Sequence, residues 1–296
     1  MKVLTVGTVV LLTLFFSFAF NLPNAAVAQQ KKTPDPNRPL QLTRTTIRHE
    51  SHRLAYGGTV TIVGAPAGSI TIEGWPRNEV DISAEIQLRA DTEADLDLLA
   101  AVNGFLVDDD SNHIRVLSVG THDKAYMRTA KKFPKTLLGL PWKIDYRIRV
   151  PILTDLEINA GRGPISLAGV EGNMRLSAVE SETNLKLSGG DLAATIAVGK
   201  LTLSVPSRSW RRGGADIRMA LGDVTVEIPP GFNGDLDADI LRIGQIDNSY
   251  LGMEAREKPG LTPQILKGRA GAGGALLKVT VGEGRISIKK LMMSDE

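Results

Sequence analysis

Three aspartates in one short segment have a spacing that could support chemistry. Asp235, Asp237 and Asp239 alternate with apolar residues, so they lie on one face of a β-strand with about 7 Å between successive carboxylates. Such a row could bind a hard cation weakly, or supply an acid and a base to a carbohydrate-cleaving enzyme. It could also form a solvated outer face that discourages edge-to-edge strand pairing. We favour this third interpretation and keep the weak cation face as a candidate.

A tryptophan lies among arginines in the segment SRSWRR. Arg208, Trp210, Arg211 and Arg212 combine an aromatic face with guanidinium groups, which together can bind a phosphate, a sulfate or a sugar acid. Trp142 ends a segment that mixes lysines with leucines and is a further candidate. A short cluster on a nearly neutral protein is more often an exposed loop, and we keep these residues as candidates for contact with a partner.

Other patterns that suggest chemistry fail on their spacing. The zinc metalloprotease motif needs histidines four residues apart, but the fourth residue after His49 is Arg53, which favours surface histidines. The oxygen-bearing run at 108–112 begins like a calcium loop, yet His113 occupies the position of the required glycine. A hairpin turn explains this run better. We therefore predict no catalytic residue, no resident metal ion and no cofactor.

The first residues indicate export. Lys2 precedes an apolar run over residues 3–20 and an A-x-A site at 26–28. This pattern predicts a signal peptide over residues 1–28, with an uncleaved anchor as the alternative, and a flexible linker over residues 29–45. We expect a periplasmic, cell-surface or extracellular protein with no stable membrane span after cleavage. The formal net charge of +2 gives no reason to expect a nucleic-acid partner.

The rest of the chain consists of aliphatic pairs at alternate positions. Hydrophobic residues make up 42% of the chain and aromatic residues 5%, with 30 glycines and no cysteine, so short strands and tight turns must pack without disulfides. From Leu156 to Ile196 the pairs follow one another at steps of 9, 9, 11 and 11 residues, so two steps make a coil of about 20 residues. The pairs assigned to the core are Val60/Ile62, Ile70/Ile72, Val80/Ile82, Ile86/Leu88, Ile148/Val150, Leu156/Ile158, Ile165/Leu167, Met174/Leu176, Leu185/Leu187, Ile196/Val198, Leu201/Leu203, Ile217/Met219, Val224/Val226, Leu236/Ala238, Leu277/Val279 and Ile286/Ile288.

This pattern predicts an all-β fold, a right-handed β-solenoid or β-helix-like stack of short strands, in one domain over residues 46–290. An antiparallel β-sandwich has the same strand spacing and is the alternative. One short helix is expected near residues 92–103, because Thr92 can cap it and Leu96 and Leu99 follow helical spacing. Insertions over residues 121–142 and 247–275 interrupt the repeats, and long loops of this kind commonly carry function.

Two blocks of sequence resemble a known family. The segments GGTVTIVGAPAGSITIEGWPRNEVDISAEI and YRIRVPILTDLEINAGRGPISLAGVEGNMRL combine spaced glycines with alternating aliphatics, and VGEGRISI has the form of a closing repeat. They are similar to the bacterial putative-adhesin family, a cell-envelope domain of unknown function with β-strand repeats that is related to auto-transporter adhesin head domains. The resemblance implies a stack of short strands and an envelope or surface location. The segment SAVESETNLKL departs from the pattern, because it lacks the glycine expected at its turn.

These observations favour a protein that binds over one that catalyses. We expect an exported cell-envelope protein with a structural or adhesive role, whose partner is an envelope or surface protein or a glycan of unknown identity. A polysaccharide-active β-helix enzyme that uses the aspartate row is one alternative, since such catalysis needs paired carboxylates at a defined separation. A partner in envelope-stress sensing or assembly is another.

Overall fold

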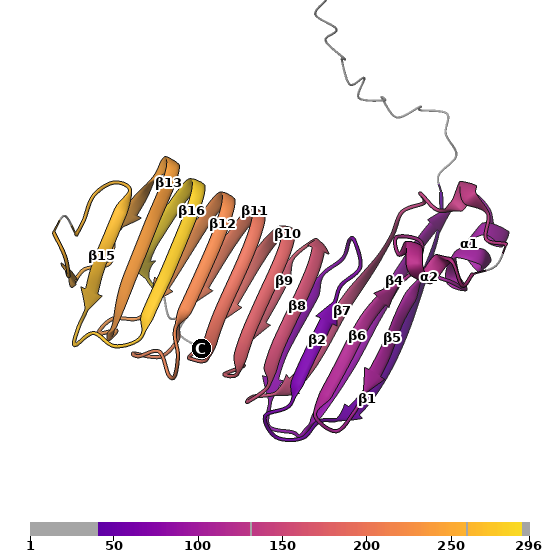
Figure 1. Cartoon of the computed structure of the whole chain (residues 1–296), viewed down its shortest axis with the longest axis horizontal. Coiled ribbons are helices and arrows are strands. Elements are labelled where there is room, and N and C mark those ends of the chain that lie inside the picture. The colour runs from indigo at the N-terminus through magenta and orange to yellow at the C-terminus, as the bar shows by residue number, and fades with distance from the viewer. Residues whose placement is uncertain (1–40, 131, 259, 292–296) are drawn as a thin grey trace, which may run out of the picture. The chain divides into compact units, whose positions relative to one another are not determined.

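The computed structural model describes residues 41–130, 132–258 and 260–291 (Figure 1). The predicted signal peptide and most of the predicted linker lie outside these residues, and the described residues belong to one compact unit. The first strand starts at Leu42, so residues 42–45, which were expected in the linker, are part of a strand. Within the described ranges, no helix has the length and apolar character needed to cross a bilayer.

The described residues form a single mixed sheet of sixteen strands with little helix. The strands are β1 (Leu42–Arg53), β2 (Thr59–Val63), β3 (Ile70–Trp75), β4 (Glu79–Ala90), β5 (Gly104–Asp109), β6 (His113–Val119), β7 (Trp142–Pro151), β8 (Asp155–Arg162), β9 (Ile165–Ala168), β10 (Asn173–Lys186), β11 (Asp191–Ser204), β12 (Ala215–Ile228), β13 (Gly234–Asn248), β14 (Met253–Ala255), β15 (Ile265–Ala270) and β16 (Leu276–Lys290). The helices are α1 (Glu93–Ala100), α2 (Lys124–Met127) and the 3₁₀ helix η1 (Lys135–Leu137). The predicted all-β class is confirmed.

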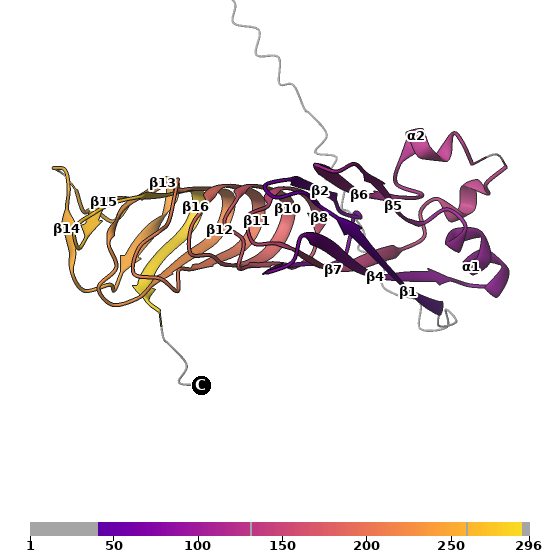
Figure 2. The ribbon, with the colours of Figure 1, turned by 90° about the horizontal axis from the view of Figure 1, so that it is seen from below.

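The sheet turns a corner, so that two faces enclose the core (Figure 2). In β10, burial alternates over Met174, Leu176 and Ala178, breaks at two exposed residues, and resumes with the opposite phase at Ser181. The first half of β10 pairs with β8 and the second half with β9. We call the face that contains β5, β6, β2, β8 and the first halves of the long strands the first face. The second face contains β1, β4, β7, β3, β9 and the second halves.

Aliphatic side chains stack in register from strand to strand. On the first face Leu156 lies opposite Met174, which lies opposite Leu192, a step of 18 residues each time and close to the predicted coil length. Strands in the middle of the unit pair in parallel, as a solenoid requires. At the ends, the strands β1–β4–β7, β5–β6 and β13–β15–β14 pair antiparallel, as in the β-sandwich alternative. The fold therefore combines both patterns, and a right-handed solenoid remains a prediction.

Glycines make the corner between the two faces. Gly199, Gly222, Gly284 and Gly244 lie in one row across β11, β12, β16 and β13. Gly222 has a φ of 138°, and a Cβ at this position would lie 1.9 Å from the carbonyl oxygen of Gly199, so only glycine fits. Ser181 of β10 occupies the same row, which locates the departure seen in SAVESETNLKL. No positive φ occurs at Ser181, so the corner does not require glycine there.

Polar side chains close the end of the core that β1 and β5 border. The Arg48 guanidinium lies 4.2 Å from the centroid of the Phe105 ring, and its Nη1 donates to the Phe105 carbonyl oxygen at 2.9 Å. The His52 ring also joins β1 to β5, with Nδ1 3.0 Å from Asp109 Oδ2. His52 is therefore an interstrand link and not a surface histidine. Charged caps of this kind keep the terminal strands of a stack soluble.

The irregular segments contain more structure than the repeats alone predict. The expected helix near 92–103 is confirmed as α1, and the Thr92 hydroxyl accepts a hydrogen bond from the backbone N–H of Asp95. The insertion at 121–142 contains α2 and η1, and the insertion at 247–275 contains β14 and β15. The run at 108–112 is a hairpin turn, as predicted, because Asp110 accepts hydrogen bonds from the N–H groups of Asn112 and His113.

The predicted core pairs are buried with one exception. Both members of each pair lie in the core except in Ile196/Val198, where Ile196 is buried and Val198 is 42% exposed. The prediction was wrong for Val198 because the corner at Gly199 shifts the alternation by one residue. Period-two patterning cannot locate such a shift, since it assumes one uninterrupted strand.

Candidate functional site

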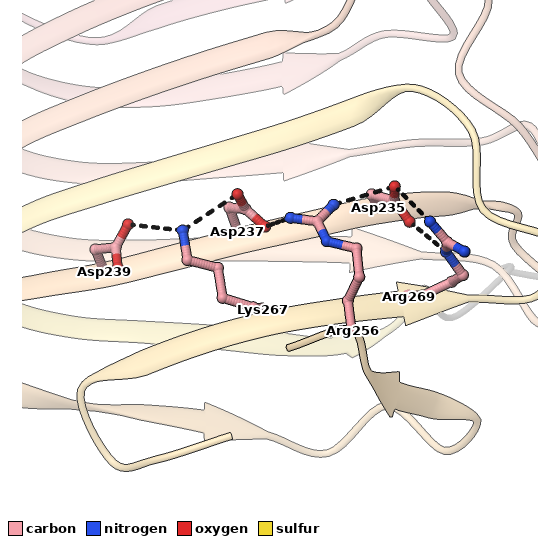
Figure 3. A network of polar contacts seen from close by, with 6 residues as sticks. All are labelled: Asp235, Asp237, Asp239, Arg256, Lys267 and Arg269. Atoms are coloured by element: carbon pink, nitrogen blue, oxygen red, sulfur yellow. Dashed lines mark hydrogen bonds and ion pairs between the residues drawn. The ribbon is translucent and has the colours of Figure 1, made fainter. Parts of the chain in front are cut away.

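The aspartate row lies on the outer surface of β13, where cations from two neighbouring segments cover it (Figure 3). The network contains Asp235, Asp237, Asp239, Arg256, Lys267 and Arg269. Asp235 accepts hydrogen bonds from Arg269, whose Nε lies at 2.9 Å, and pairs with Arg256 Nη1 at 3.1 Å. Asp237 receives Arg256 Nη2 at 2.6 Å and Lys267 Nζ at 3.2 Å. Lys267 also lies 3.7 Å from Asp239, so acids and cations alternate along the row.

This alternation changes what the carboxylates can do. The hydrogen bond from Arg269 holds the pKa of the Asp235 carboxyl below its usual range, despite partial burial that acts in the opposite direction. Burial would lower the pKa of the Lys267 ammonium, but its interactions with Asp237 and Asp239 outweigh burial and raise it. An acid–base catalyst needs a carboxyl that exchanges a proton near neutral pH. The Asp235 carboxyl is poised to stay ionised, and a metal ion would have to displace the protein's own cations.

The row instead ties the edge of the sheet together. Lys267 and Arg269 belong to β15 and lie directly opposite Asp237 and Asp235, while Arg256 follows β14. The side chain of Asp237 is only 11% exposed. The solvated outer face that we expected is thus partly covered, because the insertion folds back and supplies the three cations. Sequence reasoning missed these cations, since only strand pairing brings residue 267 next to residue 237.

The SRSWRR cluster is dispersed. Trp210 is 5% exposed and packs in the core, where its Nε1 donates to the Gly190 carbonyl oxygen at 2.8 Å, so its ring offers no face to a partner. Arg211 forms an ion pair with Glu171. Arg212 is exposed and borders a hollow of about 250 Å³ that Glu171 also lines. Arg208 is exposed as well. Trp210 is therefore a core residue, and partner contact by the arginines remains a prediction.

Trp142 is also placed by packing. Its side chain is half-buried against the core, and its ring lies 5.2 Å from that of His122 between centroids. Burial lowers the pKa of His122, which favours the neutral ring beside Trp142, although Asp123 acts in the opposite direction. The role of Trp142 in partner contact stays a prediction.

The corner itself carries a row of exposed aliphatic side chains that sequence reasoning did not single out. Val198, Leu221 and Ile243 precede the corner glycines of β11, β12 and β13, and Val179 and Leu241 lie beside them. Val179, Leu241 and Ile243 are 54%, 67% and 73% exposed. We call these five residues the aliphatic corner. A sequence signal exists, because V-G-K, L-G-D and I-G-Q each place an aliphatic residue directly before a glycine and a polar residue after it.

A groove of about 660 Å³ runs along the aliphatic corner. The small residues Ala197, Ala220 and Gly282 line it, together with Val179 and Leu241. Because these residues come from successive neighbouring strands about 4.8 Å apart, the groove crosses the strands and does not follow one of them. Two cations line it. Arg218 pairs with Asp216 at 2.6 Å, and Arg242 pairs with Glu283 at 3.0 Å.

Comparisons with known proteins give only distant likenesses. No protein-family model and no curated protein matches the chain. It is similar to a solved structure from Clostridium sporogenes ATCC 15579, a putative cell adhesion protein, with 13% identity and a TM-score of 0.39 over 83% of this chain and 100% of that chain. A putative adhesin from Bacteroides fragilis NCTC 9343 matches with 13% identity and a TM-score of 0.24 over 83% of this chain and 97% of that chain. At these values the likenesses assign no function.

Proposed function

We propose that the protein is an exported, non-catalytic protein of the cell envelope with a structural or adhesive role, of the putative-adhesin type, and that the aliphatic corner is its contact surface. The observation that carries this proposal is the group of exposed aliphatic side chains on β10, β11, β12 and β13, with Glu283 of β16 between those of β12 and β13. Monomeric soluble proteins rarely expose contiguous apolar patches larger than a few hundred Å², and larger patches commonly mark interaction sites. The in-register core supports the corner as a rigid base, so little ordering is lost on binding.

The occupant that fits is an extended segment of an envelope protein that carries aliphatic side chains and a carboxylate. Apolar side chains would cover Val179 and Leu241 in the groove. A carboxylate would lie near Arg218 or Arg242, which are exposed and whose present partners, Asp216 and Glu283, are half-buried. Surface pairs of this kind contribute roughly 0–1 kcal/mol, so exchanging them for a partner's carboxylate costs little. The aspartate network provides no comparable opening, because its own cations occupy it.

Co-sedimentation of the purified protein with isolated cell envelopes tests this proposal. We expect Val179→Glu combined with Leu241→Glu to weaken binding about ten-fold or more, since both side chains would leave an apolar contact. Leu241→Glu alone should also weaken binding, and Ile47→Glu is its matched control, because Ile47 on β1 is 68% exposed, as Leu241 is at 67%, and both changes add one negative charge. Unchanged urea midpoints would show that all three variants fold. No envelope binding by the wild type, or equal losses in the corner and control variants, would overturn the proposal.

A further inference from the structure

Another surface, on the outer side of the second face, gathers polar side chains from four neighbouring strands. On the outer side of β1, β4, β7 and β3, His49 lies opposite Ser83, Ser83 opposite Arg147, and Arg147 opposite Thr71. In the next row Asp81 lies opposite Arg149, and Arg149 opposite Glu73. The intervening residues, such as Ile82, Ile148 and Ile72, are buried, so both rows project outward. They border a hollow of about 510 Å³.

One carboxylate holds two of these side chains in place. The side chain of Asp81 is 12% exposed, and its Oδ2 accepts hydrogen bonds from Arg149 Nε at 2.9 Å and Nη2 at 2.5 Å. Its other oxygen contacts His49 Nε2 at 2.5 Å. Arg149 also stacks on Trp75, with the guanidinium carbon 4.3 Å from the ring centroid, and Trp75 Nε1 donates to the Glu79 carbonyl oxygen at 2.8 Å. Arg149 is therefore preorganised.

The remaining groups of the hollow are mostly donors. Arg147 is exposed, and no described carboxylate lies within 4.0 Å of its guanidinium. The hydroxyls of Ser83 and Thr71 flank it in the same row. No described hydrogen bond joins Ser83 to His49, so the serine, histidine and aspartate do not form a nucleophilic triad. A guanidinium with hydroxyl groups beside it is suited to a planar oxyanion, which it can bind through two parallel hydrogen bonds.

Glu73 narrows the class of ligand. It is exposed at the end of the second row, beside Arg149, and has no described cation within 4.0 Å. Together with Asp81 it disfavours a densely charged polyanion such as a nucleic acid, whose binding rests on many uncompensated cations. It can accept hydrogen bonds from the hydroxyls of a sugar. The ligand that satisfies both ends of the hollow therefore carries one carboxylate and several hydroxyl groups.

We propose that this hollow binds an acidic sugar unit of a polysaccharide. Arg147 pairs with the sugar carboxylate, Ser83 and Thr71 hydrogen-bond to it or to neighbouring hydroxyls, and Glu73 accepts from hydroxyls at the other end. Arg149 borders the sugar as a fixed donor. This site is separate from the aliphatic corner and would stand if the corner proved to bind nothing.

Isothermal titration of the purified protein with hexagalacturonate, maltohexaose and duplex DNA tests the site. We expect hexagalacturonate to bind, maltohexaose and DNA to bind at least ten-fold more weakly, and Arg147→Gln to weaken hexagalacturonate binding about ten-fold or more. Arg175→Gln is the matched control. Arg175 is exposed on the first face without a described ion pair, and its loss changes the net charge equally. The Arg175→Gln variant should bind hexagalacturonate with the same affinity as the wild type.

Three outcomes would overturn the proposal. The first is that the wild type does not bind hexagalacturonate, and the second is that it binds maltohexaose or DNA as tightly as hexagalacturonate. The third is that Arg147→Gln and Arg175→Gln weaken binding equally, which would show a general charge effect. Because Arg147 is exposed and makes no described ion pair, its substitution should leave the urea midpoint unchanged. A second variant, Glu73→Gln, separates charge from hydrogen bonding. It should reduce hexagalacturonate affinity less than Arg147→Gln does, since glutamine still accepts hydrogen bonds.

Discussion

Replacing Gly222 by alanine should destabilise the corner between the two faces. An L-residue at the native φ of 138° costs about 1–3 kcal/mol, because this backbone conformation is sparsely populated. The added methyl group would lie 1.9 Å from the carbonyl oxygen of Gly199 and 2.9 Å from the sulfur of Met219. Neither neighbour can move freely, since Met219 is buried, so overpacking adds about 1–3 kcal/mol. The free energy of unfolding should fall by about 2–6 kcal/mol in total.

Two further glycines separate strain from crowding in the same assay. At Gly231, where φ is 70° and no heavy atom lies within 4 Å, alanine should cost only about 1–2 kcal/mol. At Gly139, which is open and has no positive φ, alanine should be nearly neutral. Urea titrations followed by circular dichroism give the change in the free energy of unfolding for each of the three alanine variants. The comparison with the wild type requires that the m-values are equal. If Gly222→Ala fell within about 1 kcal/mol of Gly139→Ala, the corner would not be built as described.

Substitutions of Asp237, Trp210 and Asp81 test the roles assigned to these side chains. Asp237→Asn should lower the free energy of unfolding by about 1–3 kcal/mol. We expect glycan turnover from neither the wild type nor this variant, and wild-type turnover that Asp237→Asn abolished would favour the enzyme alternative. Trp210→Ala should lower the free energy of unfolding by about 3–5 kcal/mol because the side chain fills the core. A decrease below about 1 kcal/mol in urea titrations would show that the side chain is not a core residue. Burial alone would raise the pKa of Asp81, but hydrogen bonds from Arg149 and His49 hold it below the ordinary 3.8. That stabilisation is present above pH 3.8 and lost as the pH falls towards the lower native pKa, so thermal unfolding of Asp81→Asn should depend less on pH below about 4; parallel curves would refute the assignment.

Much of the core could be predicted from the sequence because its signal is local. Alternating aliphatic pairs such as Leu156/Ile158 and Met174/Leu176 identify buried positions, and their 18-residue step gives the stacking. Val198 shows the limit, because the shift at Gly199 depends on a backbone turn that periodicity does not contain. The same limit hid the aliphatic corner, which lies at these shifts.

The candidate sites depended on pairing between distant segments. Asp237 looked like part of an open acidic row until β15 brought Lys267 opposite it. Arg147 and Ser83 become neighbours only because β4 and β7 pair, 64 residues apart along the chain. The prediction that Trp210 contacts a partner was made for a different reason. The arginines around it indicated exposure, but tertiary packing placed the indole in the core, where it bonds to Gly190.

We propose that the protein contacts a partner in the cell envelope through the aliphatic corner. Hydroxyl-radical footprinting of the protein, free and bound to isolated envelopes, measures this directly through side-chain oxidation. We expect Val179, Leu221, Leu241 and Ile243 to be protected in the bound state while Ile47 reacts equally in both. Equal oxidation of the corner in both states, with protection elsewhere on the protein, would show that the corner is not the contact surface.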